Sequence, residues 1–261
     1  MNDSNRSSLT VEQCGMFIHE AKRIVAMTGA GISTAAGIPD FRGPNGLYTT
    51  RRYDPDRVFD ITYFRHNPGM FYRFTRDFIS ILKSIQPTWT HRFLARLESE
   101  GILSGVITQN IDTLHHLAGS KNIIEVHGSY WNAGCIQCDD FKKTGATIEW
   151  WEEQMTCGPR KPVVVCPFCS GIVKPEVVFF GEPVRDMDKA EHLVTTCDLL
   201  LVLGSSLTVY PAALLPRITS APTLIINRGE VCLEGQSNRF FIDEDLDIFL
   251  KKVVDFIDSE F

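Results

Sequence analysis

The sequence predicts an α/β protein whose main part is a Rossmann-like, doubly wound parallel sheet with a smaller, cysteine-rich and helical module. Short apolar runs recur along the chain, and most are continuous rather than alternating, as in a sheet covered on both faces. Amphipathic helical patterns separate these runs, which favours parallel strands joined by helices. A glycine-rich turn follows the first run, as in the opening turn of nucleotide-binding folds.

The helices and strands are assigned from the amino end onward. A capping-box pattern, Thr10 with Gln13, predicts a helix that ends near Lys22. Further helical patterns cover residues 68–85, entered at Pro68, then 88–100, capped at Thr88, and finally 246–258. Strands are predicted for the apolar runs 24–27, 105–108, 123–126, 199–203 and 223–226.

Two segments do not fit the alternation of strands and helices. Residues 37–66 are rich in Gly, Pro, Arg and Tyr and are expected to form a long ordered loop, a class that is often functional. Residues 130–175 carry five of the eight cysteines and are expected to form a small insert with its own centre.

Composition restricts the class of protein. The formal net charge of −6 argues against a broad nucleic-acid surface, which needs a basic face. No apolar stretch is long enough to span a membrane, and the first ten residues lack the apolar core of a secretory signal. We therefore expect a cytoplasmic protein, in which cysteines act as metal ligands or free thiols rather than disulfides.

The cysteine-rich insert contains two CxxC knuckles, Cys135 with Cys138 and Cys166 with Cys169. Two such pairs can supply four thiolates to one tetrahedral Zn²⁺, and a site with four thiolates has no open position for catalysis. The alternatives are four free thiols, or a site in which Cys157 replaces one ligand. The interval between the knuckles carries two adjacent tryptophans and is compatible with a hairpin or a short helix.

The glycine-rich turn contains Gly29 and Gly31, whose backbone N–H groups would suit a pyrophosphate. Thr34 stands where a dehydrogenase fingerprint has a third small residue, and no acidic residue closes a second strand about twenty residues on. Hydride transfer is therefore disfavoured, although a dinucleotide ligand is still expected. The plainer interpretation of these glycines is a simple tight turn.

Polar residues follow the predicted strands where their carboxyl ends meet, which is where ligands bind in open α/β sheets. Gln109, Asn110 and Asp112 follow the second strand, and His127 follows the third as a candidate general base. His115 and His116 are alternatives, and the remaining histidines are expected to be structural. Small or polar residues also follow the last two predicted strands: Gly204, Ser205, Ser206 and Asn227.

In order and spacing, these motifs resemble the sirtuin family over roughly residues 20–250. The motifs are GAGIS at 29–33, GIPDFR at 37–42, TQNID at 108–112, HG at 127–128, the two CxxC pairs, and GSS at 204–206. The resemblance implies an NAD-dependent protein-lysine deacylase that cleaves NAD to nicotinamide and transfers the acyl group to ADP-ribose. NAD would be a co-substrate, Zn²⁺ structural, and an acyl-lysine protein or peptide the partner, with neither a membrane nor a nucleic acid as direct ligand.

The resemblance also implies roles for individual residues. His127 would be the catalytic base, with Asn110 beside it. Substrate peptide would bind by strand addition to Val178, Phe179, Phe180, Gly181, Glu182 and Val209. NAD would be held by Gly29, Ala30, Gly31, Thr34, Asp40, Phe41, Arg42, Gln109, Asn110, Ile111, Asp112, Gly204, Ser205, Ser206, Asn227, Arg228, Asp245 and Leu246.

The expected domains follow from these assignments. Residues 1–36, 86–130 and 176–261 would form the Rossmann-like NAD-binding domain. Residues 37–85 would form a cofactor-binding loop with a helical module, and residues 131–175 the zinc-binding module.

Two positions in the helix after the cofactor loop bear on the acyl group that the enzyme would prefer. Relatives that prefer acidic acyl groups carry Tyr and Arg three residues apart, in the helix after the cofactor loop. Here Tyr72 is followed by Thr75, and the register shifted by one turn gives Thr75 and Phe78, so neutral acyl groups are expected. The rivals are protein ADP-ribosyltransfer at the same site and a non-catalytic NAD- and zinc-binding module. Ordinary hydrolase chemistry lacks its motifs, because the chain has no GxSxG, HExxH or GxxxxGK.

Overall fold

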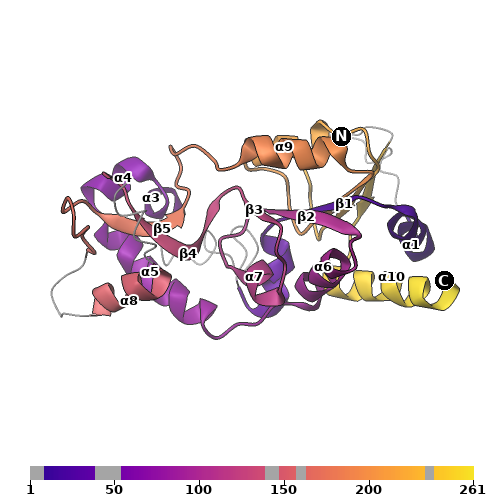
Figure 1. Ribbon diagram of the computed structural model, residues 1–261, viewed down its shortest axis with the longest axis horizontal. Coiled ribbons are helices and arrows are strands. Elements are labelled where there is room, and N and C mark those ends of the chain that lie inside the picture. Colours follow the sequence, from indigo (N-terminus) through magenta and orange to yellow (C-terminus); the bar gives the residue numbers. More distant parts are fainter. Residues whose placement is uncertain (1–8, 39–53, 139–146, 157–162, 233–237) are drawn as a thin grey trace.

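A six-stranded parallel sheet lies at the centre of the larger part of the molecule (Figure 1). The computed structural model describes residues 9–38, 54–138, 147–156, 163–232 and 238–261. The strand order is β3-β2-β1-β6-β7-β8, which is the 3-2-1-4-5-6 order of the doubly wound fold and confirms the predicted fold class. The strands are β1 (Ile24–Thr28), β2 (Leu103–Thr108), β3 (Ile123–Glu125), β6 (Leu199–Leu203), β7 (Thr223–Ile226) and β8 (Arg239–Ile242).

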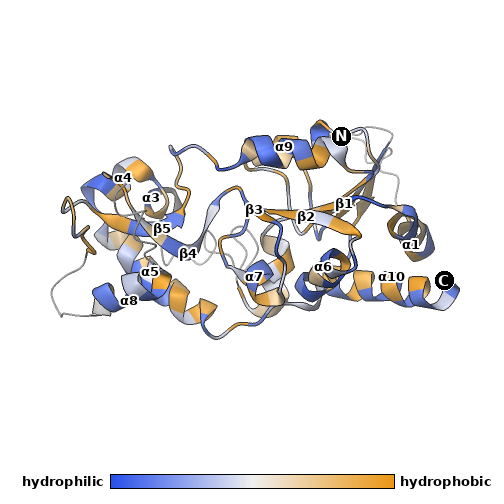
Figure 2. Ribbon diagram, in the orientation of Figure 1, coloured by the Kyte–Doolittle hydropathy of each residue, from blue (hydrophilic) through white to orange (hydrophobic). Residues whose placement is uncertain are grey.

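Helices cover both faces of this sheet. One face packs against α1 (Val11–Glu20), α6 (Trp89–Ser99) and α10 (Leu246–Glu260). The other packs against α9 (Met187–Thr196) and the 3₁₀ helix η3 (Ala212–Arg217). Within β1, Ile24 and Ala26 point to the first face and Val25 and Met27 to the second, so the strand has no polar side. This two-sided burial explains the continuous apolar runs, which are orange in Figure 2.

The five predicted strands are present, and the predicted helix caps are in place. The Thr10 hydroxyl accepts a hydrogen bond from the Gln13 N–H, and the Thr10 N–H donates to the Gln13 side-chain oxygen. Thr88 forms the same kind of box with His91. The edge strand β8 was not predicted, because it is short and begins with a charged residue. Its Arg239 guanidinium is nevertheless buried, where it donates to carbonyls and a hydroxyl in the segment 219–223.

A second group of elements lies at the opposite end of the molecule from α1 and α10 (Figure 1). An antiparallel pair, β4 (Gly128–Cys135) and β5 (Val173–Val177), packs with helices in one hydrophobic cluster. Edge-to-face aromatic contacts among Phe59, Phe64, Phe71 and Phe179 fill its centre. The helices are α3 (Pro55–Val58), α4 (Ile61–His66), α5 (Gly69–Leu82) and α8 (Ile148–Thr156).

The prediction of one long loop over residues 37–66 was wrong in its second half. Residues 55–58 and 61–66 are the helices α3 and α4, and Asp60 caps α4 by accepting from the Tyr63 N–H at 2.6 Å. Residues 39–53 lie outside the described part of the chain. Between the cysteine knuckles, the segment with the two tryptophans is the helix α8 rather than a hairpin. Among the described helices, none combines the length and apolar character that a membrane span requires.

Candidate active site and metal centre

The carboxyl ends of β1 and β6 approach each other at the point where the strand order reverses, which is where ligands bind in such sheets. The Gly31 N–H donates to the Gly204 carbonyl at 2.8 Å, and Gly204 has a φ of +63°. A Cβ on Gly31 would lie 2.7 Å from Gly204 Cα, so this approach requires glycine. The turn continues into a 3₁₀ helix, η1 (Ala30–Ala36), rather than the α-helix of a dehydrogenase.

A buried chain of hydrogen bonds joins this turn to the loop after β2. Asn110 Nδ2 donates to the Gly29 carbonyl at 3.0 Å and contacts Ser33 Oγ at 3.2 Å. Ser33 Oγ in turn donates to Asp112 Oδ2 at 2.6 Å. Burial raises the pKa of Asp112, and the Ser33 hydrogen bond opposes that shift. Sequence reasoning did not select Ser33 as a site residue, although it stands two positions after Gly31; its role depends on a partner 79 positions away in the chain.

His127 is oriented by the backbone of the same loop. Its Nδ1 lies 2.9 Å from the Gln109 carbonyl oxygen, which can only accept, so Nδ1 carries the proton and Nε2 is the basic nitrogen. Burial lowers the pKa of His127, and the bond to the Gln109 carbonyl partly offsets this. Gln109 Nε2 donates to Ser205 Oγ at 2.9 Å, which joins the ends of β2 and β6. The half-buried imidazole is therefore neutral near pH 7 and suited to accept a proton.

The competing histidine of the sequence analysis, His115, has a different environment. It is 2 % exposed and its Nε2 contacts Thr28 Oγ1 at 2.9 Å. His116 pairs with Glu125 at 3.1 Å and stacks on Trp131. Neither ring is aligned by the Gln109 carbonyl as His127 is.

Several residues expected on the adenosine side use their side chains for contacts within the protein. Asn227 follows β7, and its side chain donates to the Arg228 carbonyl at 2.9 Å. Asp245 caps α10 through the Ile248 N–H and pairs with Arg228 at 3.3 Å. Leu246 packs in the core beneath α10. The Asp245 carboxylate is therefore already engaged, and Leu246 is 8 % exposed.

The remaining predicted NAD residues divide into three groups. Thr34 is exposed beside the glycine turn, and Ala30 is half-buried there. Ser206 contacts Thr208 Oγ1 at 3.1 Å, and Ile111 is buried in the cluster around the aromatic residues. Three further residues lie outside the described part of the chain: Asp40, Phe41 and Arg42.

The predicted peptide-binding segment, residues 178–182, is hydrogen-bonded to the backbone of His127. The Val178 N–H donates to the His127 carbonyl at 2.8 Å, and Phe180 exchanges two backbone bonds with Phe59 and Ile61. Phe179 is 1 % exposed, whereas the Phe180 side chain is 52 % exposed. Gly181 has a φ of +91°, and Val209 is half-buried just before η3. The Phe179 side chain is therefore closed to a peptide, and its N–H and carbonyl are already bonded to Glu182.

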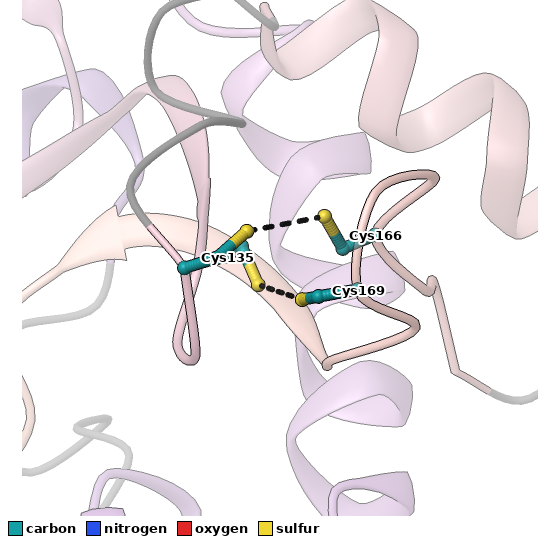
Figure 3. Close-up of side chains that lie close together, drawn as sticks. Cys135, Cys166 and Cys169 are labelled. Atoms are coloured by element: carbon teal, nitrogen blue, oxygen red, sulfur yellow. Dashed lines mark hydrogen bonds between the residues drawn. The ribbon is translucent and has the colours of Figure 1, made fainter.

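The four knuckle cysteines converge on one point (Figure 3). Their sulfur atoms all lie within 4.8 Å of one another, with Cys135 and Cys169 at 3.6 Å and Cys138 and Cys166 at 3.7 Å. Tetrahedral Zn²⁺ with Zn–S bonds of about 2.3 Å requires sulfurs about 3.8 Å apart, so the group fits zinc. Pairing of Cys135 with Val173 in the β4–β5 ladder brings the two knuckles together. Cys157 lies outside the described residues.

Tyr72 is a structural link and not a pocket residue. Its side chain is fully buried, and its hydroxyl bonds the Val164 N–H at 3.1 Å and the Val173 carbonyl. It thereby fixes α5 to the chain on both sides of the second knuckle, at Val164 before it and at Val173 after it. Thr75 is also buried and contacts the Tyr130 hydroxyl at 3.2 Å.

Comparisons with known proteins agree with this architecture. A family model described as the Sir2 family matches residues 29–211. The chain is 42 % identical over 219 residues to an NAD-dependent protein deacetylase of Thermotoga maritima, covering 82 % of this chain and 85 % of the relative. It is 40 % identical over 252 residues to one from Sulfurisphaera tokodaii, covering 95 % and 96 %.

Solved structures give the same result. A structure described as Sir2 with a p53 peptide and NAD⁺ has a TM-score of 0.82 and 36 % identity, covering 95 % of this chain and 98 % of that one. A structure described as Sir2 bound to acetylated peptide has a TM-score of 0.83 and 34 % identity, with the same coverage. With the match over residues 29–211 and these identities over nearly the whole length, the chain belongs to the Sir2 family.

Proposed function

We propose that this protein is an NAD-dependent protein-lysine deacylase that cleaves NAD⁺ to nicotinamide and transfers the acyl group to ADP-ribose. The observation that carries the proposal is the orientation of His127, whose Nδ1 is held at 2.9 Å by the Gln109 carbonyl beside the buried Asn110–Ser33–Asp112 chain. We infer that the basic nitrogen faces the ribose, because the loop that orients His127 also carries Asn110 and Asp112, whose polar groups suit a carboxamide and a ribose. Relatives with this family fold bear the name NAD-dependent protein deacetylase.

We place NAD⁺ across the switch point of the sheet. The N–H groups of Gly29 and Gly31 already donate to the Leu203 and Gly204 carbonyls, which corrects the expectation that they bind the pyrophosphate. Thr34 and the other backbone N–H groups of the turn after β1 would contact it instead. Asn110, Ile111 and Asp112 would line the nicotinamide pocket, and Gln109 would contact the adjoining ribose. The adenosine half would lie over Gly204, Ser205, Ser206, Asn227 and Arg228. Asp245 and Leu246 would support it indirectly, Asp245 through its ion pair with Arg228 and Leu246 as the first residue of α10.

The chemistry follows from this placement. The carbonyl oxygen of the acyl-lysine attacks the ribose carbon as nicotinamide leaves. His127 Nε2 accepts a proton from a ribose hydroxyl, directly or by relay, so that this oxygen can attack the acyl carbon. Water then completes the release of lysine and acyl-ADP-ribose. The zinc takes no part in these steps, because four thiolates would fill its coordination sphere.

The test is a reaction of the protein with NAD⁺ and an acetyl-lysine peptide. Nicotinamide and deacetylated peptide should appear together in equal amounts. His127→Ala should abolish turnover and still bind NAD⁺, whereas His192→Ala, an exposed histidine on α9, should leave turnover unchanged. Absence of both products from zinc-loaded protein removes the proposal.

Isotopically labelled NAD⁺ separates deacylation from the rival activity. A deacylase leaves the label in soluble acyl-ADP-ribose, whereas an ADP-ribosyltransferase leaves it on protein. Nicotinamide release with protein-bound label would therefore favour the rival. Absence of nicotinamide together with measurable NAD⁺ binding would favour a non-catalytic module.

We further propose that the accepted acyl groups are neutral. Relatives that prefer acidic acyl groups carry Tyr and Arg where this chain has Tyr72 and Thr75, and both of these side chains are buried, with their hydroxyls bonded to Val173 and Tyr130. Neither position offers a cation to a carboxylate. A panel of acetyl, propionyl and succinyl peptides should therefore give turnover with the first two, and faster turnover with succinyl would contradict the proposal.

The domain division and the location are part of the same proposal. We assign residues 1–36, 86–130 and 176–261 to the NAD-binding domain, 37–85 to the cofactor loop and helical module, and 131–175 to the zinc module. A cluster of four reduced thiols is favoured in a reducing compartment, which supports a cytoplasmic location.

A further inference from the structure

An ion pair joins the buried Lys174 to Glu182 at the end of the segment 178–182, and the proposed chemistry uses neither side chain. Lys174 on β5 is 6 % exposed, and its Nζ lies 3.0 Å from Glu182 Oε2. The same ammonium donates to the Val177 carbonyl and lies 4.3 Å from the centre of the Phe179 ring. Burial lowers the pKa of Lys174, and the nearby Glu182 carboxylate opposes that shift. A charge held this far from water is retained only with close partners.

Both partners of the pair fix the backbone of the segment. Glu182 Oε2 also accepts from the Phe179 N–H at 2.8 Å, and the Glu182 N–H returns to the Phe179 carbonyl at 2.9 Å. The segment is thereby closed into a turn around Gly181. Glu182, which the sequence analysis took for a substrate contact, directs its carboxylate inward and not toward a ligand.

The pair is also one peptide unit from the proposed base. The Lys174 ammonium binds the Val177 carbonyl, which belongs to the same peptide group as the Val178 N–H. That N–H donates to the His127 carbonyl at 2.8 Å. The orientation of this one peptide group therefore links the buried charge pair to the residue that carries the basic imidazole.

We propose that Lys174 and Glu182 are positioning residues that set the shape of the peptide-binding segment and its alignment with His127. This inference rests on the proposed function, because it concerns the peptide substrate of the same site. The pair touches no substrate itself. Its loss should weaken peptide binding and leave the NAD⁺ side, on the β1, β2 and β6 ends, intact.

The test compares Lys174→Met, Glu182→Gln and the double variant with wild type. We expect KM for an acetyl-lysine peptide to rise about tenfold in each single variant, because each leaves a charged group of the pair without one of its hydrogen-bond partners. KM for NAD⁺ should stay within about twofold. Lys174→Arg, which keeps the charge, should recover most of the peptide affinity.

The double variant tests whether the two residues act as a pair. Each single change leaves one charge without its ionic partner, whereas the double change leaves none. The rise in peptide KM should therefore be smaller in the double variant than the product of the single effects. Glu176→Gln is the matched control. It breaks the more exposed pair of Glu176, also on β5, with Arg185 and is only a minor electrostatic partner of Lys174, so its peptide KM should change far less than that of Glu182→Gln.

The outcomes separate this inference from the proposed function. Peptide binding is also measured without turnover, by fluorescence anisotropy of a labelled acetyl-lysine peptide. A wild-type protein that binds this peptide and releases no nicotinamide removes the proposed function alone. An active wild type whose variants keep their peptide KM, or lose affinity for peptide and NAD⁺ equally, overturns the positioning role. If Lys174→Met does not fold, the near-isosteric Glu182→Gln decides.

Discussion

The stability of this protein should fall steeply in mild acid because two histidines are buried without charge. His91 at the start of α6 has no exposed surface, and its ring centre lies 4.7 Å from that of His115. Burial lowers the pKa of His91 to about 4, against a smaller opposing effect of Asp247, and lowers the pKa of His115 well below its usual range. His91 Nε2 and His115 Nδ1 have no hydrogen-bond partner among the described residues.

The direction of the effect follows from proton binding. Below pH 6.5, the unfolded chain protonates His91 and the folded protein does not, so the free energy of unfolding falls as the pH falls. The loss continues until the pH reaches the folded pKa of about 4. At about 1.4 kcal/mol per pH unit, the difference between the two pKa values corresponds to about 3 kcal/mol from His91 alone.

His91→Gln is the informative substitution. His91 occupies the third position of the capping box of α6, where Gln is a usual residue, so the cap with Thr88 should survive. The free energy of unfolding is measured with urea at pH 7.5, 6.5, 5.5 and 4.5, with zinc release followed in parallel. Between pH 5.5 and 4.5, the variant should lose about 1 kcal/mol less stability per pH unit than wild type, since one titrating group is gone.

Two comparisons show whether the difference in slope comes from His91. Acid also protonates the cysteine ligands, but wild type and variant share that loss, so the difference between their slopes isolates His91. His192→Gln, on the exposed side of α9, should keep the wild-type slope. Equal slopes for wild type and His91→Gln would refute the reasoning, because they would mean that His91 is protonated in the folded protein.

Three further predictions concern the site and the zinc module. First, kcat/KM should fall as the pH decreases through a pKa below 6.5 and stay level above about pH 7, because burial lowers the pKa of His127; a rate that climbs steadily to pH 9 would contradict this. Second, Tyr72→Phe should lower the free energy of unfolding in urea by about 1–3 kcal/mol and speed zinc release, because the buried Val164 N–H loses its partner. The ranking of acyl peptides by turnover should not change. Third, Cys138→Ser should reduce bound zinc, measured by elemental analysis, to well below one ion per chain and lower the melting temperature; full zinc content would point to another ligand set.

The sheet could be predicted because its strands are buried on both faces. Residues 199–203 are five consecutive apolar residues, a run of strand length and too short for a typical helix, and all five are buried in β6. β8 could not be predicted, because Arg239 looks like a surface residue until the loop 219–223 supplies its hydrogen-bond partners. The helices α3 and α4 are too short for a periodic pattern and owe their stability to the aromatic cluster around Phe64.

The location of the site was predictable, but its internal contacts were not. Ligands bind at the carboxyl ends of parallel strands, so polar residues after each strand must gather there whatever their partners are. The partners depend on side-chain directions across long separations: Ser33 with Asp112, and His127 with the Gln109 carbonyl. Motif spacing carries no information on such directions.

The same limit explains why Asp245 and Glu182 are ambiguous from sequence. An acidic residue just before an apolar periodic segment can cap a helix or meet a ligand, and Asp245 does cap α10. Glu182 follows a glycine in a turn expected to bind peptide, yet its carboxylate faces a lysine eight positions earlier. In both cases the motif identifies a segment expected to bind a ligand, while its acidic side chain accepts a hydrogen bond from a nearby backbone N–H. Substitutions there should therefore change the geometry of binding and not the chemistry, which is why the comparison of the two KM values for Glu182→Gln is more informative than its kcat.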